Sequence, residues 1–179
     1  MRVILLLFAA SMILIGATNV PAQSNQSLYS DLGSQKCKTL EFDKESSYSL
    51  QECSGIAGYK LLVEDGDSRQ DVTVVRPDGT KHPLKLGEVI SPQFSTVGPK
   101  AEWRVKNDKG KIIPVALIVR FNASENPEDS SKITSYLVVA KITPEKICVT
   151  DKIQPGASAN EEARRAADRA AGKPCLEAR

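Results

Sequence analysis

Histidine, the residue that enzymes use most often to move protons, occurs only once in this 179-residue chain, at position 82. His82 alternates with Leu84 and Leu86, which predicts a half-buried side chain on a strand. A catalytic histidine also needs a nucleophile or a carboxylate beside it, and no G-x-S-x-G motif supplies the nucleophile. No glycine-rich loop has the spacing that phosphate binding requires. We therefore predict no catalytic residue and no cofactor.

Metal-ligand clusters are also missing from the sequence. The cysteines lie far apart, without the C-x-x-C pairs and histidine partners of zinc sites. The acidic stretch at residues 64–71 (EDGDSRQD) is the one place that suggests calcium. Counted from Asp65, an EF-hand loop would need a ligand, a glycine and a glutamate where the chain has Arg69, Gln70 and Arg76. We interpret Asp65-Gly66 as a hairpin turn instead, with no metal bound.

Neither charge nor hydropathy suggests a nucleic-acid or membrane partner for the body of the chain. The sequence has 24 Lys and Arg against 22 Asp and Glu, a net charge of +2. A chain so close to neutral has no basic footprint for nucleic acid. After Ala22 no apolar run approaches the ~20 residues that a transmembrane helix needs.

The first 22 residues have the layout of a secretory signal peptide. Arg2 precedes an apolar run over residues 3–16, and Val20-Pro21-Ala22 resembles a cleavage site. We predict a cut after Ala22. The alternative is an uncleaved anchor, but the apolar run is short for a membrane span. Residues 23–36 are polar and serine-rich, and we expect a flexible lead-in there. The mature protein is then periplasmic or extracellular.

Four cysteines remain after the predicted cut, and in an exported protein an even number predicts disulfides. They are Cys37, Cys53, Cys148 and Cys175. A hairpin register that places Leu40 opposite Leu50 also places Cys37 opposite Cys53. Residues directly opposite on antiparallel strands stand at a Cα spacing that a disulfide tolerates. We therefore predict a Cys37–Cys53 bridge, which leaves Cys148 to pair with Cys175.

Residues 37–153 read as successive short strands separated by turn residues. Tyr59, Leu61 and Val63 alternate with polar residues, and the turns contain Asp-Gly, Pro-Asp-Gly and Asn-Asp-Lys-Gly. Trp103 shares a strand face with Val105, which predicts a core residue rather than a sugar-binding platform. We predict one domain over residues 37–179. Its fold is mainly β, an antiparallel meander, sandwich or open barrel, with one C-terminal α-helix packed on the sheet.

That helix is predicted at about residues 158–171. Ser158 and Glu161 fit a capping box, and an alanine stripe recurs at helical spacing. The stripe consists of Ala163, Ala166, Ala167 and Ala170. Such a helix can lie close against the sheet. A run of about 14 helical residues covers ~20 Å, enough to return along the last strand and bring Cys175 to Cys148.

The helix also has a basic side that could contact an anionic partner. It carries Arg164, Arg165, Arg169 and Lys173. The alternative is a solvated outer face opposite the alanine stripe, because acidic residues dilute the charge. Our leading interpretation is a non-enzymatic binding or inhibitor-like module with a protein or an anionic envelope component as its partner. A small carboxylate-dependent hydrolase is the alternative, although no local pair of acidic residues favours it.

Overall fold

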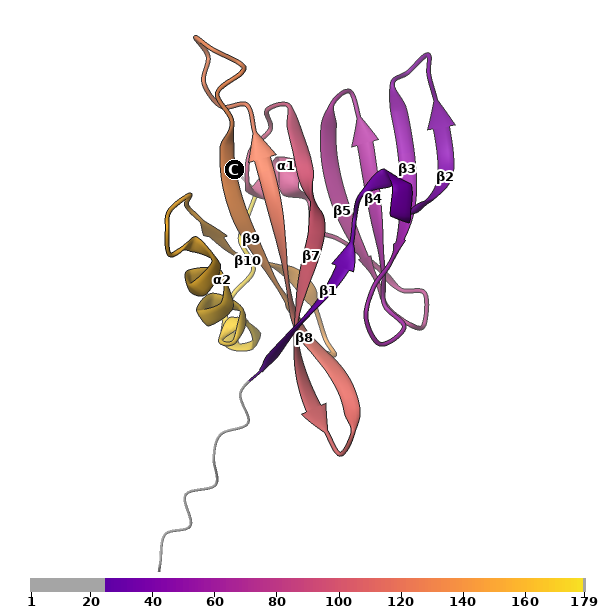
Figure 1. Ribbon diagram of the computed structural model, residues 1–179, viewed down its shortest axis with the longest axis vertical. Helices are drawn as coiled ribbons and strands as arrows, with labels where there is room; N and C mark the ends of the chain where they lie inside the picture. Colours follow the sequence, from indigo (N-terminus) through magenta and orange to yellow (C-terminus); the bar gives the residue numbers. More distant parts are fainter. Residues whose placement is uncertain (1–24, 179) are drawn as a thin grey trace, which may run out of the picture.

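A computed structural model describes residues 25–178, which form ten strands and two α-helices (Figure 1). The strands are β1 (Gln26–Asp31), β2 (Lys38–Asp43), β3 (Tyr48–Ser54), β4 (Lys60–Gly66), β5 (Arg69–Val75), β6 (Lys81–Pro83), β7 (Ser95–Asp108), β8 (Lys111–Ala123), β9 (Thr134–Ile142) and β10 (Ile147–Ile153). The helices are α1 (Leu86–Val89) and α2 (Ala159–Ala167), with 3-10 turns at Ser34–Lys36 and Ala170–Gly172. The predicted signal peptide, residues 1–22, lies outside the described residues.

The strands form one open, mixed sheet. Its order is β10-β9-β8-β7-β5-β4-β3-β2, while β1 pairs with β7 and β6 pairs with β5. Neighbouring strands are antiparallel except β5 and β7, which meet in parallel through the single pair Arg69 and Ser95. The sheet therefore has two halves with a narrow connection (Figure 1). The predicted mainly β fold is confirmed, in its open form.

One buried cluster joins the two halves of the sheet. Alternate residues of β4 and β5, such as Leu61 and Val72, contact alternate residues of β7 and β8, such as Trp103 and Leu117. Trp103 is fully buried, and its Nε1–H donates a hydrogen bond to Ser30 Oγ at 2.9 Å. Trp103 is thus a core residue, as predicted, with its one polar atom satisfied.

A second buried cluster lies between α2 and the opposite face of β8 and β9. The four alanines of the predicted stripe are all buried there. They pack against Ala116, Ile118, Leu137 and Val139. The helix and the following 3-10 turn end at Gly172, close to the predicted limit. The C-terminal helix on the sheet is confirmed.

The predicted capping box at the start of α2 is wrong. Ser158 has φ −93° and ψ 2°, not the extended backbone of a capping residue. Its hydroxyl donates to the carboxylate of Glu162 instead of accepting from the backbone. Glu161 pairs with Arg165 one turn further on.

Both predicted disulfides are present. The Cα atoms of Cys37 and Cys53 are 4.4 Å apart, and those of Cys148 and Cys175 are 5.7 Å apart. Leu176 N–H donates to the Val149 carbonyl at 2.8 Å, so the C-terminal tail follows the edge of β10. The second bridge therefore closes over a sheet edge.

The hairpin register that predicted the first bridge is correct only at its cysteine end. Thr39 pairs with Gln51 as expected, but a bulge at Leu40 puts Glu41 opposite Leu50. The expected apolar pair of Leu40 and Leu50 does not form. Leu40 is exposed on the last strand of the sheet, where no further strand covers it.

We predicted a flexible lead-in over residues 23–36, and this prediction is wrong for residues 26–31, which form a strand. Gln26–Asp31 forms β1, which pairs along its whole length with β7. Leu28 packs against the main core. The segment has little apolar content of its own, so its order comes from the long strand beside it.

Candidate functional site

Four connections meet at one end of the sheet, which we call the loop end. They are residues 43–48, 65–69, 91–95 and 124–133, and Figure 1 shows them spread along the top of the molecule. Backbone hydrogen bonds tie three of them together: Ser95 N–H donates to Ser68 O and Ser124 N–H to Phe94 O, each at 2.9 Å. Arg69 Nε–H adds a bond to Pro92 O at 3.1 Å. Contacts between loops therefore hold the connections at residues 65–69, 91–95 and 124–133 in one arrangement.

Large apolar side chains are exposed on the loop end. The exposed fraction is 70% for Phe42, 51% for Phe94 and 54% for Ile133. Phe94 and Ile133 line a depression of about 290 Å³ that also includes Ser68. Ser68 borders a second depression, of about 330 Å³, that includes Phe42 and Tyr48. The two depressions thus adjoin at Ser68 and expose aromatic, aliphatic and hydroxyl groups.

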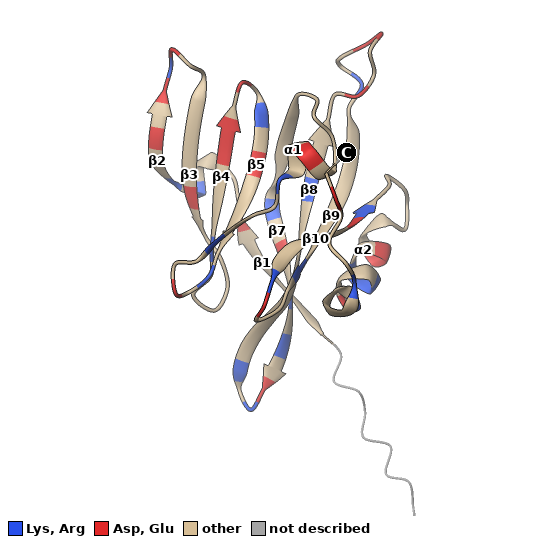
Figure 2. Cartoon of the chain, turned by 180° about the vertical axis from the view of Figure 1, so that it is seen from behind, with Lys and Arg blue, Asp and Glu red and all other residues tan. Residues whose placement is uncertain are grey.

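The loop end is also acidic. Its four connections contain seven acidic and three basic residues. The acidic ones are Asp43, Glu45, Asp65, Asp67, Glu125, Glu128 and Asp129. The opposite end carries the β7–β8 hairpin, where Lys106, Lys109 and Lys111 surround Asp108. Figure 2 shows this separation of charge along the molecule, which a net charge of +2 conceals.

The acidic stretch at residues 64–71 forms one tip of the loop end. Its turn is Asp67-Ser68, with φ of 51° and 59°, two residues beyond the predicted Asp65-Gly66. Positive φ at both positions is the geometry of a type I′ hairpin turn. Asp67 pairs with Arg69 at 2.6 Å, and Asp65 accepts from Gln70 at 3.0 Å. No group of three or more His, Cys, Asp and Glu side chains within residues 25–178 is arranged to hold a metal.

Glu64 and Asp71 lie directly opposite each other on β4 and β5, and a carboxylate-dependent hydrolase requires two neighbouring carboxyl groups. Burial raises the pKa of Asp71, and the charge of Glu64 adds to the effect. These two effects are opposed by hydrogen bonds that the Asp71 carboxylate accepts from the backbone N–H groups of Leu86, Val72 and Gly87. Asp71 therefore holds the start of α1 in place, which is a structural role.

His82 lies on β6 and contacts Arg76 rather than a nucleophile. Its Nε2 accepts a hydrogen bond from Arg76 Nε at 2.9 Å. Burial lowers the pKa of His82, and the charge of Arg76 lowers it further. The Arg76 guanidinium also donates to the Thr143 carbonyl, so the pair connects two turns of the fold.

A recess of about 260 Å³ lies between α2 and the sheet, and we call it the helix-side recess. Beside it, β7 bulges: Val97 pairs with Phe121 and Ala101 with Val119, so residues 98–100 together oppose Arg120. A Cβ on Gly98 would lie 2.7 Å from the Arg120 Cβ, and only glycine permits that approach. Bulges often redirect side chains beside binding sites, and here the bulge brings Lys100 to the recess.

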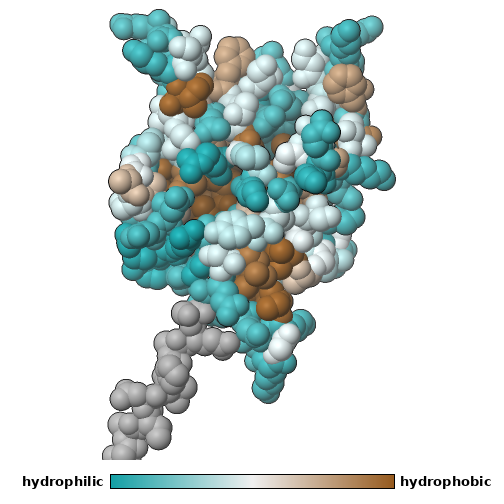
Figure 3. All heavy atoms as spheres, viewed as in Figure 1, coloured by the Kyte–Doolittle hydropathy of each residue, from teal (hydrophilic) through white to brown (hydrophobic). Residues whose placement is uncertain are grey.

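The floor of the helix-side recess is apolar and its rim is polar. Ile118, Leu137 and Ala163 lie at the floor. The rim residues are Tyr29, Lys100, Glu102, Arg120 and Asn160. Figure 3 shows hydrophobic atoms in a hollow between α2 and β1, surrounded by hydrophilic ones.

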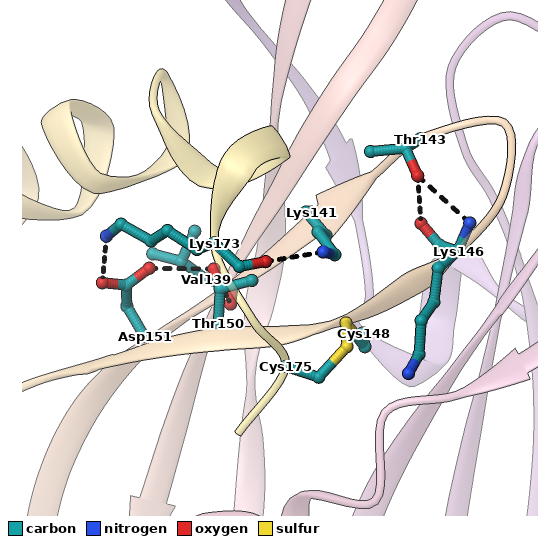
Figure 4. The surroundings of a disulfide bond; sticks show 9 residues. All are labelled: Val139, Lys141, Thr143, Lys146, Cys148, Thr150, Asp151, Lys173 and Cys175. Carbon is teal, nitrogen blue, oxygen red and sulfur yellow. Dashed lines mark hydrogen bonds and ion pairs between the residues drawn. A yellow bond between two sulfur atoms is a disulfide. The ribbon is translucent and has the colours of Figure 1, made fainter. Parts of the chain in front are cut away.

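The four basic residues predicted to share one side of α2 have different surroundings in the structure. Arg164 faces the sheet, where its Nε–H donates to Glu102 at 2.7 Å. Burial raises the pKa of Glu102, but hydrogen bonds from Arg164 and Ser27 outweigh it, so the pKa is lowered. Lys173 donates to Asp151 at 2.5 Å beside the Cys148–Cys175 bridge (Figure 4).

Only the other two members of that predicted surface stay on the outer side of the helix. Arg165 and Arg169 are exposed. Arg165 lies 3.5 Å from Glu161, and Arg169 is close enough to Asp168 to lower the pKa of its carboxyl. The four predicted residues therefore do not form one cationic surface.

A partly buried ion pair between Arg104 and Asp168 lies under the end of α2, and the sequence alone does not predict it. Arg104, which alternates with apolar residues and reads as solvent-facing, is only 8% exposed. Its guanidinium donates to both carboxylate oxygens of Asp168, at 2.8 and 2.9 Å, and to Asn25 O at 2.8 Å. The same guanidinium donates to Ser27 Oγ at 2.5 Å. This network connects β1, β7 and α2, and no local pattern signals it.

No family model matches this chain, and no curated protein or solved structure matches it. None of the helices within residues 25–178 is long and apolar enough to cross a membrane. The two disulfides are consistent with export. The chain thus forms a disulfide-stabilised, mainly β domain.

Proposed function

We propose that the protein is an exported binding module without catalytic activity, and that its loop end contacts a partner protein with a basic surface. The predicted signal peptide and the two disulfides support a periplasmic or extracellular location. An inhibitor of a hydrolase is one concrete form of such a module, and an envelope assembly factor is another.

The observation that carries the proposal is the exposure of Phe42, Phe94 and Ile133 in two adjoining depressions on the loop end. Exposed aromatic groups among hydroxyl side chains are the composition that protein-binding loops favour. Phe42 lies on β2, which pairs with β3, and Phe94 lies in a loop that hydrogen-bonds to its neighbours, so little order has to be gained on binding. Apolar anchors of this kind supply most of the affinity at protein interfaces.

The charge of the loop end indicates the chemistry of the partner. Seven acidic residues against three basic ones favour a basic surface opposite them. Attraction between exposed charges is screened by salt, with a screening length of ~3 Å at 1 M. The association rate should therefore rise at low salt, and the affinity should fall at high salt. The contribution of the aromatic contacts to the affinity should not be screened.

Crosslinking from cell-envelope or culture extract tests the proposal. The parent, a Phe42→Ser/Phe94→Ser variant and an Ile113→Ser control are compared at low and at about 1 M salt. Ile113 is a matched control because it is an exposed apolar residue at the opposite end of the molecule. Thermal unfolding of all three proteins checks that each is folded.

We expect the parent and the Ile113→Ser control to capture the same protein, and the double variant to lose it. Capture that the double variant retains would refute the loop end as the contact. Capture of no specific protein by the parent would refute the binding function.

A further inference from the structure

We propose that the helix-side recess binds a small ligand that carries a carboxylate on an apolar body. The inference concerns a different part of the molecule from the loop end and does not depend on it. The recess combines an apolar floor, two cationic side chains and a volume suited to one residue-sized group.

The charges around the recess are not balanced. Glu102 is its one acidic lining residue, and this carboxylate already accepts from Arg164 at 2.7 Å and from Ser27 at 2.5 Å. Among residues 25–178, Lys100 forms one ion pair, a long contact of 4.0 Å with Asp31. The charge of Lys100 is therefore available to a ligand.

Arg120 is the stronger reason for an anionic ligand. Its guanidinium donates one hydrogen bond within the described chain, to the neutral hydroxyl of Ser135 at 2.8 Å, and it forms no ion pair with residues 25–178. The side chain is half-buried beside Gly98. A guanidinium has five N–H donors in a fork that matches a carboxylate. A carboxylate in the recess would supply the missing acceptor.

The floor and the volume define the rest of the ligand. Ile118, Leu137 and Ala163 offer contact to an aliphatic or aromatic group, not to a sugar or a phosphate. A volume of about 260 Å³ is below the ~300–1,000 Å³ of pockets for drug-sized ligands. The fitting class is a branched or aromatic monocarboxylate, either as a free acid or as the C-terminal residue of a peptide.

The test is a titration of the disulfide-bonded exported protein followed by amide NMR shifts. The probes are 4-methylpentanoate for the free acid and N-acetyl-leucine for a peptide C-terminus, each compared with its uncharged amide. We expect a carboxylate probe to shift Gly98, Lys100 and Asn160, and its amide to bind about tenfold more weakly or not at all, as the loss of a charged hydrogen bond implies. The tighter of the two carboxylates identifies the source of the ligand.

Three variants locate the site. Arg120→Gln keeps a hydrogen-bonding side chain and removes the charge. Lys100→Gln changes an exposed side chain whose ion pair with Asp31 is 4.0 Å long. We expect either change to weaken carboxylate binding, by about tenfold for Arg120→Gln. Arg165→Gln, on the outer side of α2, is the matched control and should bind like the parent.

The proposal is overturned if carboxylate and amide bind equally, if the shifts map outside the recess, or if neither probe binds. If Arg120→Gln does not fold, Lys100→Gln provides the test. Equal carboxylate binding by Lys100→Gln and the parent would then contradict the proposal.

Discussion

Asp168→Asn tests the partly buried ion pair of Arg104 and Asp168, whose network connects β1 and β7 to the end of α2. Arg104 is 8% exposed and donates to both Asp168 oxygens. Breaking a buried pair costs ~3–5 kcal/mol because the remaining charge is uncompensated. Asp168 is 35% exposed and the amide still accepts one hydrogen bond, so screening reduces the expected cost to about 2 kcal/mol. That cost corresponds to a melting point about 4–8 °C lower for a chain of this size.

The effect should depend on pH. Burial raises the pKa of the Asp168 carboxyl, but hydrogen bonds from Arg104 and Asn25 outweigh it, and the pKa falls below its ordinary 3.8. A carboxyl with a lowered pKa stabilises the folded state at pH values above its unfolded pKa. That stabilisation is lost as the pH falls through the lower, folded value. The difference between parent and variant is therefore complete at pH 7 and shrinks below about pH 4.

Urea unfolding at pH 7 and at pH 3 measures both effects. Glu161→Gln is the matched control, because its carboxylate lies on the same helix in an exposed pair with Arg165, 3.5 Å away. Such a pair contributes ~0–1 kcal/mol. The reasoning is refuted if Asp168→Asn unfolds like Glu161→Gln at pH 7, or if its deficit stays the same at pH 3.

Three further predictions concern the helix, its tether and the mature terminus. Ala166→Asp places a charge against the sheet and should lower stability by ~2 kcal/mol or more, whereas Arg165→Ala should stay within ~0.5 kcal/mol; equal thermal unfolding would show that α2 is not docked. Cys175→Ser opens a loop with a sequence separation of 27, worth roughly 3 kcal/mol, and an unchanged unfolding midpoint under oxidising conditions would contradict this. Intact mass of the exported protein should place its N-terminus at Gln23, and a full-length, membrane-bound chain would exclude the cleavage.

The candidate sites were only partly predictable from the sequence. Arg120 is the one charge in an otherwise apolar run, which is a usable signal, and Gly98-Pro99 within a strand marks the bulge opposite it. No such signal in the sequence distinguishes the environment of Arg164 from that of Arg165. Arg164 faces Glu102 on the sheet, whereas Arg165 faces outward and lies 3.5 Å from Glu161. A helical period predicts which residues share a face, but not which acids lie beneath it.

The sequence by itself determined the features that depend on short-range pattern. Alternation of apolar residues defined most of the strands, the alanine period defined the buried face of α2, and the spacing of the cysteines within those elements led to both disulfides. These features are encoded locally, because strand and helix periods follow directly from backbone geometry.

Only the tertiary structure decided which polar residues become ordered or buried. Gln26–Asp31 is polar and becomes a strand because β7 offers it a hydrogen-bonding edge. Arg104 is buried because Asp168, 64 positions away, neutralises it. The helix-side recess exists because a bulge in β7 meets a helix from the far end of the chain. Each depends on contacts between distant segments, and those contacts form only when the elements pack together.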